Sequence, residues 1–342
     1  MRGIQITDFG SPLRLAELEI EKLPAGYARI KVQSNGICAT DVKMVDGVGF
    51  RPKLPFTPGH EPAGIVEEIN SDSESHRNLE GKAVVIHPHV ACGMCENCIS
   101  GNENICLRML ASYGINTNGG MQEYLNVPLR NLVALPDDVS MDMGALAGGV
   151  VAVPLRGLKQ LGTLLSKKIL ILGTGGLAFS AVQIAKSMGA EVIVVGRKQE
   201  KLEVASRIGA DFVINSNTTD YVAEIKTITG GFGVHHSVDL AGDSNEVPKL
   251  IQTVRRGGKV LIIGYSANTF QTAYNKLALD SISLMGTRSY TRNDLSESVG
   301  LISRNKCKPI ISRIFPLEEA NEAMSMVRTG QSVGRVMIHP NE

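Results

Sequence analysis

The stretch KILILGTGGLAFSAVQIAKSMGAEVIVVGRK, residues 168–198, decides the fold of this chain. It opens with an apolar strand over residues 169–172 and turns through residues 173–178 into a helix predicted to begin at Phe179. Apolar residues at a spacing of three and four give this helix one buried stripe, and Gly189 ends it. A second apolar strand covers residues 191–195, so the two strands should pair in parallel through a right-handed crossover.

The turn has the composition of a dinucleotide-binding loop. Gly173 allows a tight turn, Gly175 lets a pyrophosphate approach the backbone, and Ala178 stands where helix and strand pack closely. The helix start then offers unpaired N–H groups to the phosphates. The alternative is a plain turn between strand and helix, but the flanking strands favour a nucleotide site. The predicted contact residues are Gly173, Thr174, Gly175, Gly176 and Leu177.

The end of the second strand indicates which nucleotide is preferred. An acidic residue usually binds the ribose 2′-hydroxyl there, but this chain has Gly196, Arg197 and Lys198. An arginine can pair with a 2′-phosphate, so NADP is favoured over NAD. The alternative is that both cations are solvated and NAD binds without an acidic anchor.

Length and composition exclude several classes of protein. A chain of 342 residues allows about two domains, and 43% hydrophobic with 20% charged residues is ordinary for a globular protein. A net charge of +1, no Trp and 4% aromatic residues argue against a nucleic-acid partner. The first residues lack the apolar run of a signal peptide, and no uninterrupted run of about 18 apolar residues could span a membrane. We therefore expect a cytoplasmic protein whose six cysteines are metal ligands or core residues.

The chain divides into regions of different pattern. Residues 1–148 read as short strands with frequent turns and predict a β-rich, barrel-like domain. Residues 149–288 alternate strands with helices and predict a doubly wound α/β sheet. Residues 289–342 read as two amphipathic helices and a strand, which we expect to return to the first domain.

Four cysteines predict a closed metal site. Thiolates at such short spacing in a reducing compartment bind zinc in a tetrahedral, structural site that clamps a lobe over about residues 90–108. Free thiols or a disulfide pair are the alternative. The predicted ligands are Cys92, Cys95, Cys98 and Cys106.

A second, looser set contains Cys38 and His60. One Cys and one His can begin a catalytic zinc site with an open position, although alone they are more often core residues. Asp41 could accept a hydrogen bond from His60, and Thr40 could pass on the proton of a bound alcohol.

Taken together, these motifs resemble the zinc-containing medium-chain alcohol dehydrogenase family over nearly the whole chain. The resemblance implies a GroES-like catalytic domain (residues 1–148 and 289–342), a Rossmann domain (residues 149–288) and an active site in the cleft between them. It implies catalytic zinc on Cys38 and His60, with Thr40 relaying the alcohol proton, and hydride transfer to or from nicotinamide. The motifs that carry it lie at residues 36–41, 59–61, 92–106, 173–177 and 257–259.

Two positions depart from the family pattern. The third zinc ligand aligns with Gly148, which has no side chain, and Glu61 is the nearest substitute. Adjacent residues of a regular strand point to opposite faces, so Glu61 needs irregular backbone to join His60 at a metal. Lys43 stands where many members place the histidine that ends the proton relay, and a surface lysine is the interpretation we favour slightly.

The sequence thus predicts an oxidoreductase that moves hydride between NAD(P) and an alcohol, polyol or sugar carbon. Its alternatives are a zinc-free quinone or enone reductase on the same fold and a catalytically silent NADP-binding protein. The expected partners are a small-molecule substrate and further copies of the chain, in a dimer or tetramer.

Overall fold

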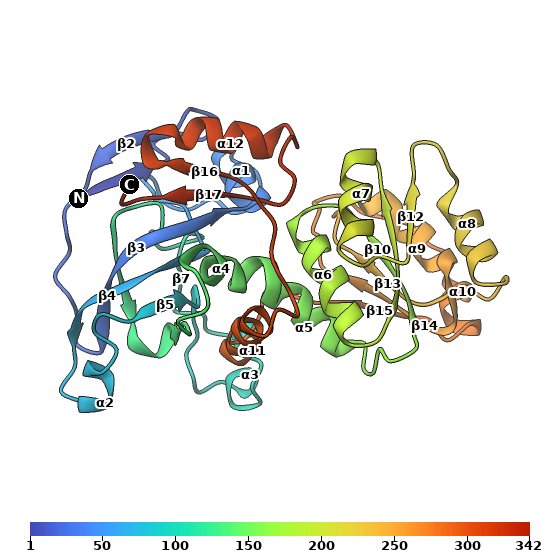
Figure 1. Cartoon of the computed structure of the whole chain (residues 1–342), viewed down its shortest axis with the longest axis horizontal. Helices are drawn as coiled ribbons and strands as arrows, with labels where there is room; N and C mark the ends of the chain where they lie inside the picture. The colour runs from blue at the N-terminus through green and yellow to red at the C-terminus, as the bar shows by residue number, and fades with distance from the viewer. The chain divides into compact units, whose positions relative to one another are not determined.

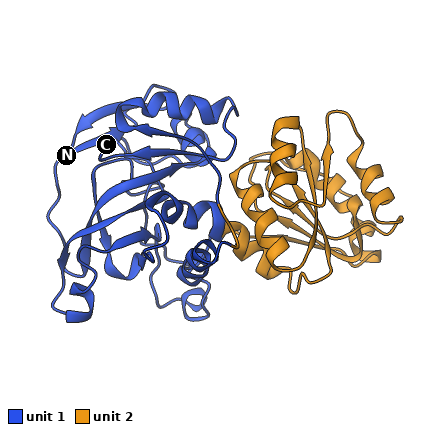
Figure 2. Cartoon of the chain, viewed as in Figure 1, with its two compact units in different colours: residues 1–152, 290–305, 309–342 blue, residues 153–289, 306–308 orange.

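The computed structural model describes residues 1–342, which divide into two compact units (Figure 2). Unit 1 contains residues 1–152, 290–305 and 309–342, and unit 2 contains residues 153–289 and 306–308. The sequence placed its boundaries at residues 148/149 and 288/289. The short return of residues 306–308 to unit 2 is held by Gln183, which bonds both the N–H and the carbonyl of Lys308.

Unit 1 is built on a seven-stranded sheet whose central strand is β3 (Tyr27–Ile37). Alternate residues of β3 are buried, as the period-two pattern predicts, and Ala28, Ile30 and Val32 are fully enclosed. β3 pairs antiparallel with β4 (Pro62–Asn70), β8 (Tyr124–Pro128) and β17 (Arg335–His339). The sheet is completed by β5 (Ala83–Ile86), β9 (Leu132–Ala134) and β16 (Ile311–Pro316).

Smaller elements complete unit 1. Two short sheets are formed by β1 (Arg2–Gln5) with β2 (Arg14–Glu17) and by β6 (His89–Val90) with β7 (Ala111–Ser112). Its helices are α1 (Ala39–Val45), α2 (Glu74–Arg77), α3 (Glu96–Ile99), α4 (Met141–Leu146), α11 (Arg292–Ser303) and α12 (Ala320–Arg328), with the π-helical turn η3 (Ala147–Ala152).

Unit 2 is a six-stranded, all-parallel sheet in the order β12-β11-β10-β13-β14-β15. This is the doubly wound order, in which the chain direction across the sheet reverses between β10 and β13 and opens a crevice at their carboxyl ends. Figure 1 shows α6 and α7 on one side of the sheet and α8 and α9 on the other. The strands are β10 (Lys168–Leu172), β11 (Glu191–Gly196), β12 (Phe212–Asn215), β13 (Val234–Asp239), β14 (Val254–Ile262) and β15 (Ser283–Gly286).

The helices of unit 2 are α5 (Val153–Gln160), α6 (Gly176–Ser187), α7 (Gln199–Arg207), α8 (Tyr221–Ile228), α9 (Val247–Thr253) and α10 (Tyr274–Leu279). The prediction that α6 begins at Phe179 is wrong by one turn. Its N-cap is Gly175 in extended conformation, so the helix and its free N–H groups begin at Gly176.

The sequence pattern missed the helical run Met141–Gln160. It is apolar and long enough to be compared with a membrane span, but 67% of its most apolar window is buried inside the protein. Burial of that extent is typical of a core helix and gives only weak support for a membrane span.

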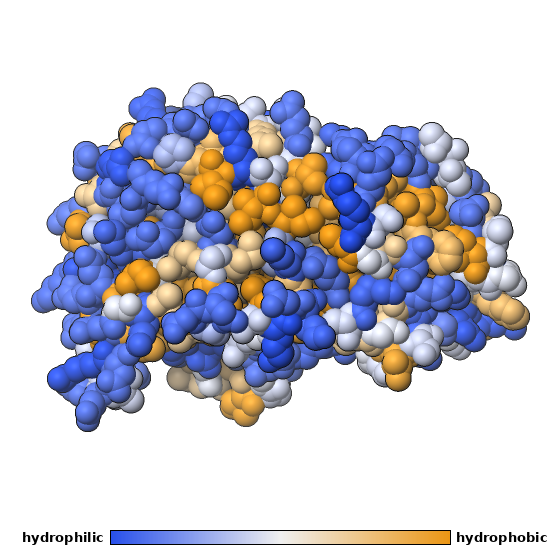
Figure 3. Space-filling view, in the orientation of Figure 1, coloured by the Kyte–Doolittle hydropathy of each residue, from blue (hydrophilic) through white to orange (hydrophobic).

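Exposed apolar side chains gather near α3. Met94, Ile99 and Leu107 are 72%, 76% and 64% exposed. Figure 3 shows hydrophobic side chains at the lower end of unit 1, over the segment with α3, in addition to larger hydrophobic areas elsewhere on the visible face. This segment therefore has little apolar core of its own to hold it folded.

Candidate metal centres and dinucleotide site

Unit 1 brings Cys38, His60 and Glu61 together. One ligand atom from each lies within 4.8 Å of the other two. Cys38 is the N-cap of α1, directly after β3, and the other two residues immediately precede β4. Gly59, at φ +104°, makes the backbone irregular there, which is the condition for adjacent side chains to face one point.

Asp41 orients this cluster. One of its oxygens lies 3.1 Å from Nδ1 of His60, and the other accepts the N–H of Cys38 at 2.8 Å. Burial lowers the pKa of the His60 imidazole, but the charges and hydrogen bonds of Asp41 and Cys38 outweigh it and hold that pKa well above 6.5. Burial raises the pKa of the Cys38 thiol, yet the charge of Arg335 and the bond with His60 bring it below the ordinary value. This shift favours the thiolate, the form in which a cysteine binds a metal.

The Glu61 carboxylate sits in a space that only glycines leave open. A β-carbon at Gly36 would collide with its Oε2, and one at Gly149 would collide with its Oε1. Arg335, itself buried, donates from Nη2 to Oε1 at 2.5 Å. Oε2 is buried and has no hydrogen-bond partner. A buried carboxylate oxygen without a partner is costly unless a cation or proton satisfies it.

Gly148, the expected place of the third ligand, faces Tyr290. A β-carbon there would collide with the Tyr290 hydroxyl, so the phenol fills the volume that a ligand side chain would use. Tyr290 is 3% exposed, and its ring packs edge-on against His87 with centroids 5.2 Å apart. Burial and the charge of Glu61 raise the pKa of Tyr290, so it stays a neutral phenol. Neither Tyr290 nor Arg335 was found from the sequence, since no local motif marks them.

Thr40 and Lys43 lie on α1. The Thr40 Oγ1 is 3.7 Å from the Cys38 thiol and half-buried, close enough to contact a group bound at the cluster. Lys43 is half-buried in the last turn of the same helix.

The four cysteines of the lobe converge between β6 and β7. Their Sγ atoms are 3.9 Å apart for Cys92 and Cys98, 3.5 Å for Cys95 and Cys98, and 3.8 Å for Cys95 and Cys106. Disulfide sulfurs would be about 2 Å apart, whereas tetrahedral zinc with bonds of about 2.3 Å places sulfurs about 3.8 Å apart. The lobe therefore has the geometry of a closed zinc site.

Electrostatics in the lobe also fit a cation. Backbone N–H groups of Leu107 and Cys98 lower the pKa of Cys95 to about 6. Burial and the neighbouring Cys95 thiol raise the pKa of Cys98 to about 12. Four thiolates cannot all ionise side by side without a positive charge among them, and a zinc ion would supply one.

In unit 2 the glycine turn has room for a phosphate. Gly173 adopts φ +122°, which disfavours any other residue, and a β-carbon at Gly175 would meet nothing within 4 Å. Open space thus lies in front of the backbone at the N-terminus of α6, where Gly176 and Leu177 are the first two residues of the helix. Such a cradle fits a pyrophosphate.

At the end of β11, a side chain at Gly196 would collide with Thr174 and approach Leu202 within 3.2 Å. A side chain at the position of the usual acidic anchor therefore fits only if Thr174 moves. Arg197 and Lys198 follow it and are exposed. The carbonyl of Arg197 accepts a bond of 2.9 Å from Asn217, which fixes the local backbone.

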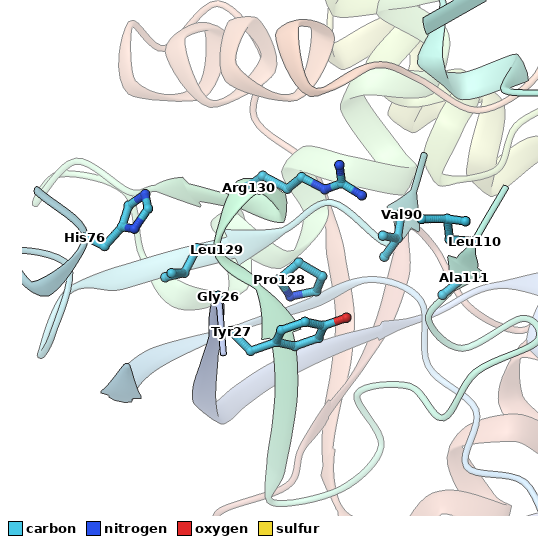
Figure 4. A pocket seen from close by; sticks show the side chains of 9 residues that line it. All are labelled: Gly26, Tyr27, His76, Val90, Leu110, Ala111, Pro128, Leu129 and Arg130. Atoms are coloured by element: carbon cyan, nitrogen blue, oxygen red, sulfur yellow. The ribbon is translucent and has the colours of Figure 1, made fainter. Parts of the chain in front are cut away.

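Two pockets lie elsewhere in the units. A pocket of about 230 Å³ at the carboxyl ends of β13 and β14 is lined by Asp239, Gly242 and Tyr265, among others, where doubly wound folds bind ligands. A larger one of about 490 Å³ in unit 1 is open to solvent and lined mainly by apolar groups with Tyr27, His76 and Arg130 (Figure 4). No residue of the metal clusters lines either pocket.

Known proteins match both parts of the chain. Residues 24–137 match the alcohol dehydrogenase GroES-like domain, and residues 176–304 match the zinc-binding dehydrogenase family. An alcohol dehydrogenase of Geobacillus stearothermophilus is 31% identical over 99% of both chains. An NAD-dependent alcohol dehydrogenase of Sulfurisphaera tokodaii is 31% identical over 99% of this chain and 100% of its own. The solved alcohol dehydrogenase of Aeropyrum pernix superposes with a TM-score of 0.90 at 29% identity, covering 99% and 100% of the two chains.

Proposed function

Because this chain belongs to the zinc-containing medium-chain alcohol dehydrogenase family and is an alcohol oxidoreductase, we propose that Cys38, His60 and Glu61 hold its catalytic zinc. The observation that carries the proposal is the partnerless, buried Oε2 of Glu61, beside a thiol and an imidazole. Sulfur, nitrogen and oxygen donors are a set that zinc accepts, and three protein ligands leave a fourth position open. Glu61 would take the role that Gly148 cannot.

When bound, zinc supplies a Lewis acid that polarises the oxygen of an alcohol or carbonyl. The residues around it would do the rest. Asp41 holds His60 through Nδ1, which leaves Nε2 for the metal. Thr40 would accept a hydrogen bond from the alcohol and pass its own hydroxyl proton on to solvent as the alcohol proton arrives, and Arg335 would balance the charge of Glu61.

The cofactor we propose is NADP, with NAD as the weaker ligand. Gly173, Gly175 and the N-terminus of α6 would hold the pyrophosphate. Support for NADP comes from Gly196, which offers no acidic side chain where Thr174 already crowds the position, and from the two cations after it. Arg197→Ala should raise the KM for NADP by about 10-fold or more and leave the KM for NAD nearly unchanged, since only NADP carries the 2′-phosphate.

The test of the whole proposal is a panel of alcohols, polyols and sugars with NADP and NAD, together with zinc counting. We expect turnover and one zinc in each of the two ligand clusters of every chain. A Cys38→Ala variant should keep only the lobe zinc and lose turnover. Equal turnover in that variant would refute the site.

A zinc-free quinone or enone reductase is the second candidate, and one observation favours it: Arg335 already neutralises Glu61. It predicts zinc only in the lobe and reduction of quinones rather than alcohol oxidation. A silent NADP-binding protein would bind the cofactor and turn over nothing even after zinc is restored.

Assembly and location belong to the same proposal. Strand β15 is an edge of the parallel sheet, and its Leu284 is 36% exposed, so a second copy could pair there in a dimer or tetramer. Thiolate ligands in the lobe favour a reducing cytoplasm. Sedimentation of the purified chain tests the assembly.

A further inference from the structure

The peptide that carries His60 lies beneath a loop rich in glycine, residues 112–121, which we call the glycine loop. Three consecutive N–H groups of this loop bond to the segment before His60. Gly119 donates to the carbonyl of Thr57 at 2.7 Å, Gly120 to that of Gly59 at 2.7 Å, and Met121 to that of Pro58 at 3.1 Å. In the opposite direction, Asn118 Oδ1 accepts the N–H of Thr57 at 3.0 Å.

The approach of the two backbones is so close that it requires glycine. A β-carbon at Gly114 would collide with the carbonyl of Gly59 and lie 2.6 Å from the nitrogen of His60. One at Gly119 would collide with the same carbonyl oxygen. Side-chain β-carbons do not approach backbone atoms this closely, so an alanine at either position has to displace the peptide between residues 59 and 60.

The glycine loop is itself held in place. The Ser112 carbonyl accepts N–H groups from Ile115 and Asn116 at 3.0 Å each, and Asn116 Oδ1 accepts the N–H of Ser112 at 2.7 Å. Its first residue belongs to β7, which pairs with β6, and these two strands flank the four-cysteine lobe. The loop is therefore a fixed element in its own right.

We propose that the glycine loop positions His60 for metal binding, with Gly114, Gly119 and Asn118 as positioning residues. The loop fixes the peptide plane and Asp41 fixes the ring, so that together they aim one imidazole nitrogen at the point shared with Cys38 and Glu61. This inference rests on the proposed function, because it assumes that zinc binds there. Displacing one of the three ligands by a fraction of an ångström lowers the affinity of the site for zinc, although every donor atom is still present.

The test measures zinc retention during titration with a chelator. The zinc that the wild type binds and Cys38→Ala does not is the pool bound at His60. The zinc that Cys38→Ala retains is the pool in the lobe. Gly114→Ala should release the first pool at a chelator concentration about 10–100-fold lower than wild type, with the lobe zinc unchanged. The matched control is Gly81→Ala, because Gly81 has φ +73° against +72° at Gly114, lies outside the lobe, and has nothing within 4 Å of its β-carbon.

If Gly114→Ala does not fold, two variants of Asn118 test the inference in its place. Asn118→Ala removes the bond to Thr57 and should shift release in the same direction, whereas Asn118→Asp keeps the acceptor oxygen and should restore the wild-type value. Unchanged release in folded Gly114→Ala, or in Asn118→Ala, would overturn the inference and leave the proposed function standing. A wild-type chain that binds only the lobe zinc would overturn both.

Discussion

Arg335 and Glu61, 274 residues apart in the chain, form a buried ion pair with Nη2 and Oε1 2.5 Å apart. The second oxygen of Glu61 has no partner, so the pair neutralises the charge of the carboxylate but leaves one acceptor open. This incomplete pairing distinguishes Glu61 from a purely structural residue.

Removing one member of this ion pair should lower the free energy of unfolding far more than replacing both members together. Arg335→Met leaves a buried carboxylate and should lower the free energy of unfolding by about 3–5 kcal/mol. Glu61→Leu with Arg335→Met buries no lone charge and should be more stable than Arg335→Met alone. Urea unfolding of the wild type, the single variants Arg335→Met and Glu61→Leu, and the double variant measures the coupling; strictly additive costs would show that the two side chains do not interact.

Gly149 should control metal content. Gly149→Ala places a β-carbon on the Glu61 carboxylate, so the chain should keep its lobe zinc and lose the other, as emission spectroscopy of the dialysed protein would show. The control is Gly300→Ala in α11, where the new methyl meets only the flexible end of Arg304, at 3.1 Å. That variant should keep both metals and gain up to about 1 kcal/mol of helix stability. A Gly149→Ala chain with both metals would exclude Glu61 as a ligand.

Loss of zinc from the lobe should also weaken zinc binding at His60. Cys98→Ser removes one of four thiolates, and the lobe, which has few apolar contacts of its own, should lose its zinc and its order. The glycine loop starts at the foot of the lobe, so zinc at His60 should also become easier to extract. Cys307→Ser is the matched control, since Cys307 is buried outside both clusters. Identical zinc release and thermal midpoints in the two variants would contradict this.

Acid should destabilise the protein through His236. Burial, followed by the charge of Lys259, lowers the pKa of this 8%-exposed histidine to about 4. Between pH 6.5 and about 4 the unfolded chain binds a proton at His236 that the folded chain does not. His236 therefore leaves the free energy of unfolding unchanged above pH 6.5 and lowers it as the pH decreases through that window.

His236→Gln should therefore flatten the pH profile. Between pH 7 and pH 5 the wild type should lose about 2 kcal/mol more of its unfolding free energy than this variant. Urea unfolding at both pH values measures the difference, and His76→Gln, at the surface, should follow the wild type. Parallel profiles for wild type and His236→Gln would rule out this histidine as the cause.

Local spacing in the chain was enough to predict the parts whose ligands and hydrogen bonds are neighbours in sequence. The cysteines from Cys92 to Cys106 and the turn from Gly173 to Leu177 each lie within about one loop, so their geometry follows from a few backbone angles. The two kinds of sheet were confirmed for the same reason, because period and spacing are read residue by residue. The family that the motifs resemble was confirmed by the two family models that match the chain. The NADP preference, the zinc ligation by the lobe cysteines, the phosphate contacts of residues 173–177 and the roles at Cys38, Thr40, His60 and Glu61 stay predictions.

Only the tertiary structure decided how the gap at Gly148 is filled. Tyr290 enters it from a distant segment, Arg335 reaches Glu61 from the last strand, and Gly114 lies on the peptide of His60. These contacts depend on volumes left empty by glycines and on charges brought together by packing. No pattern within a stretch of sequence encodes them, because each arises between segments that meet only when the sheet of unit 1 has closed around its core.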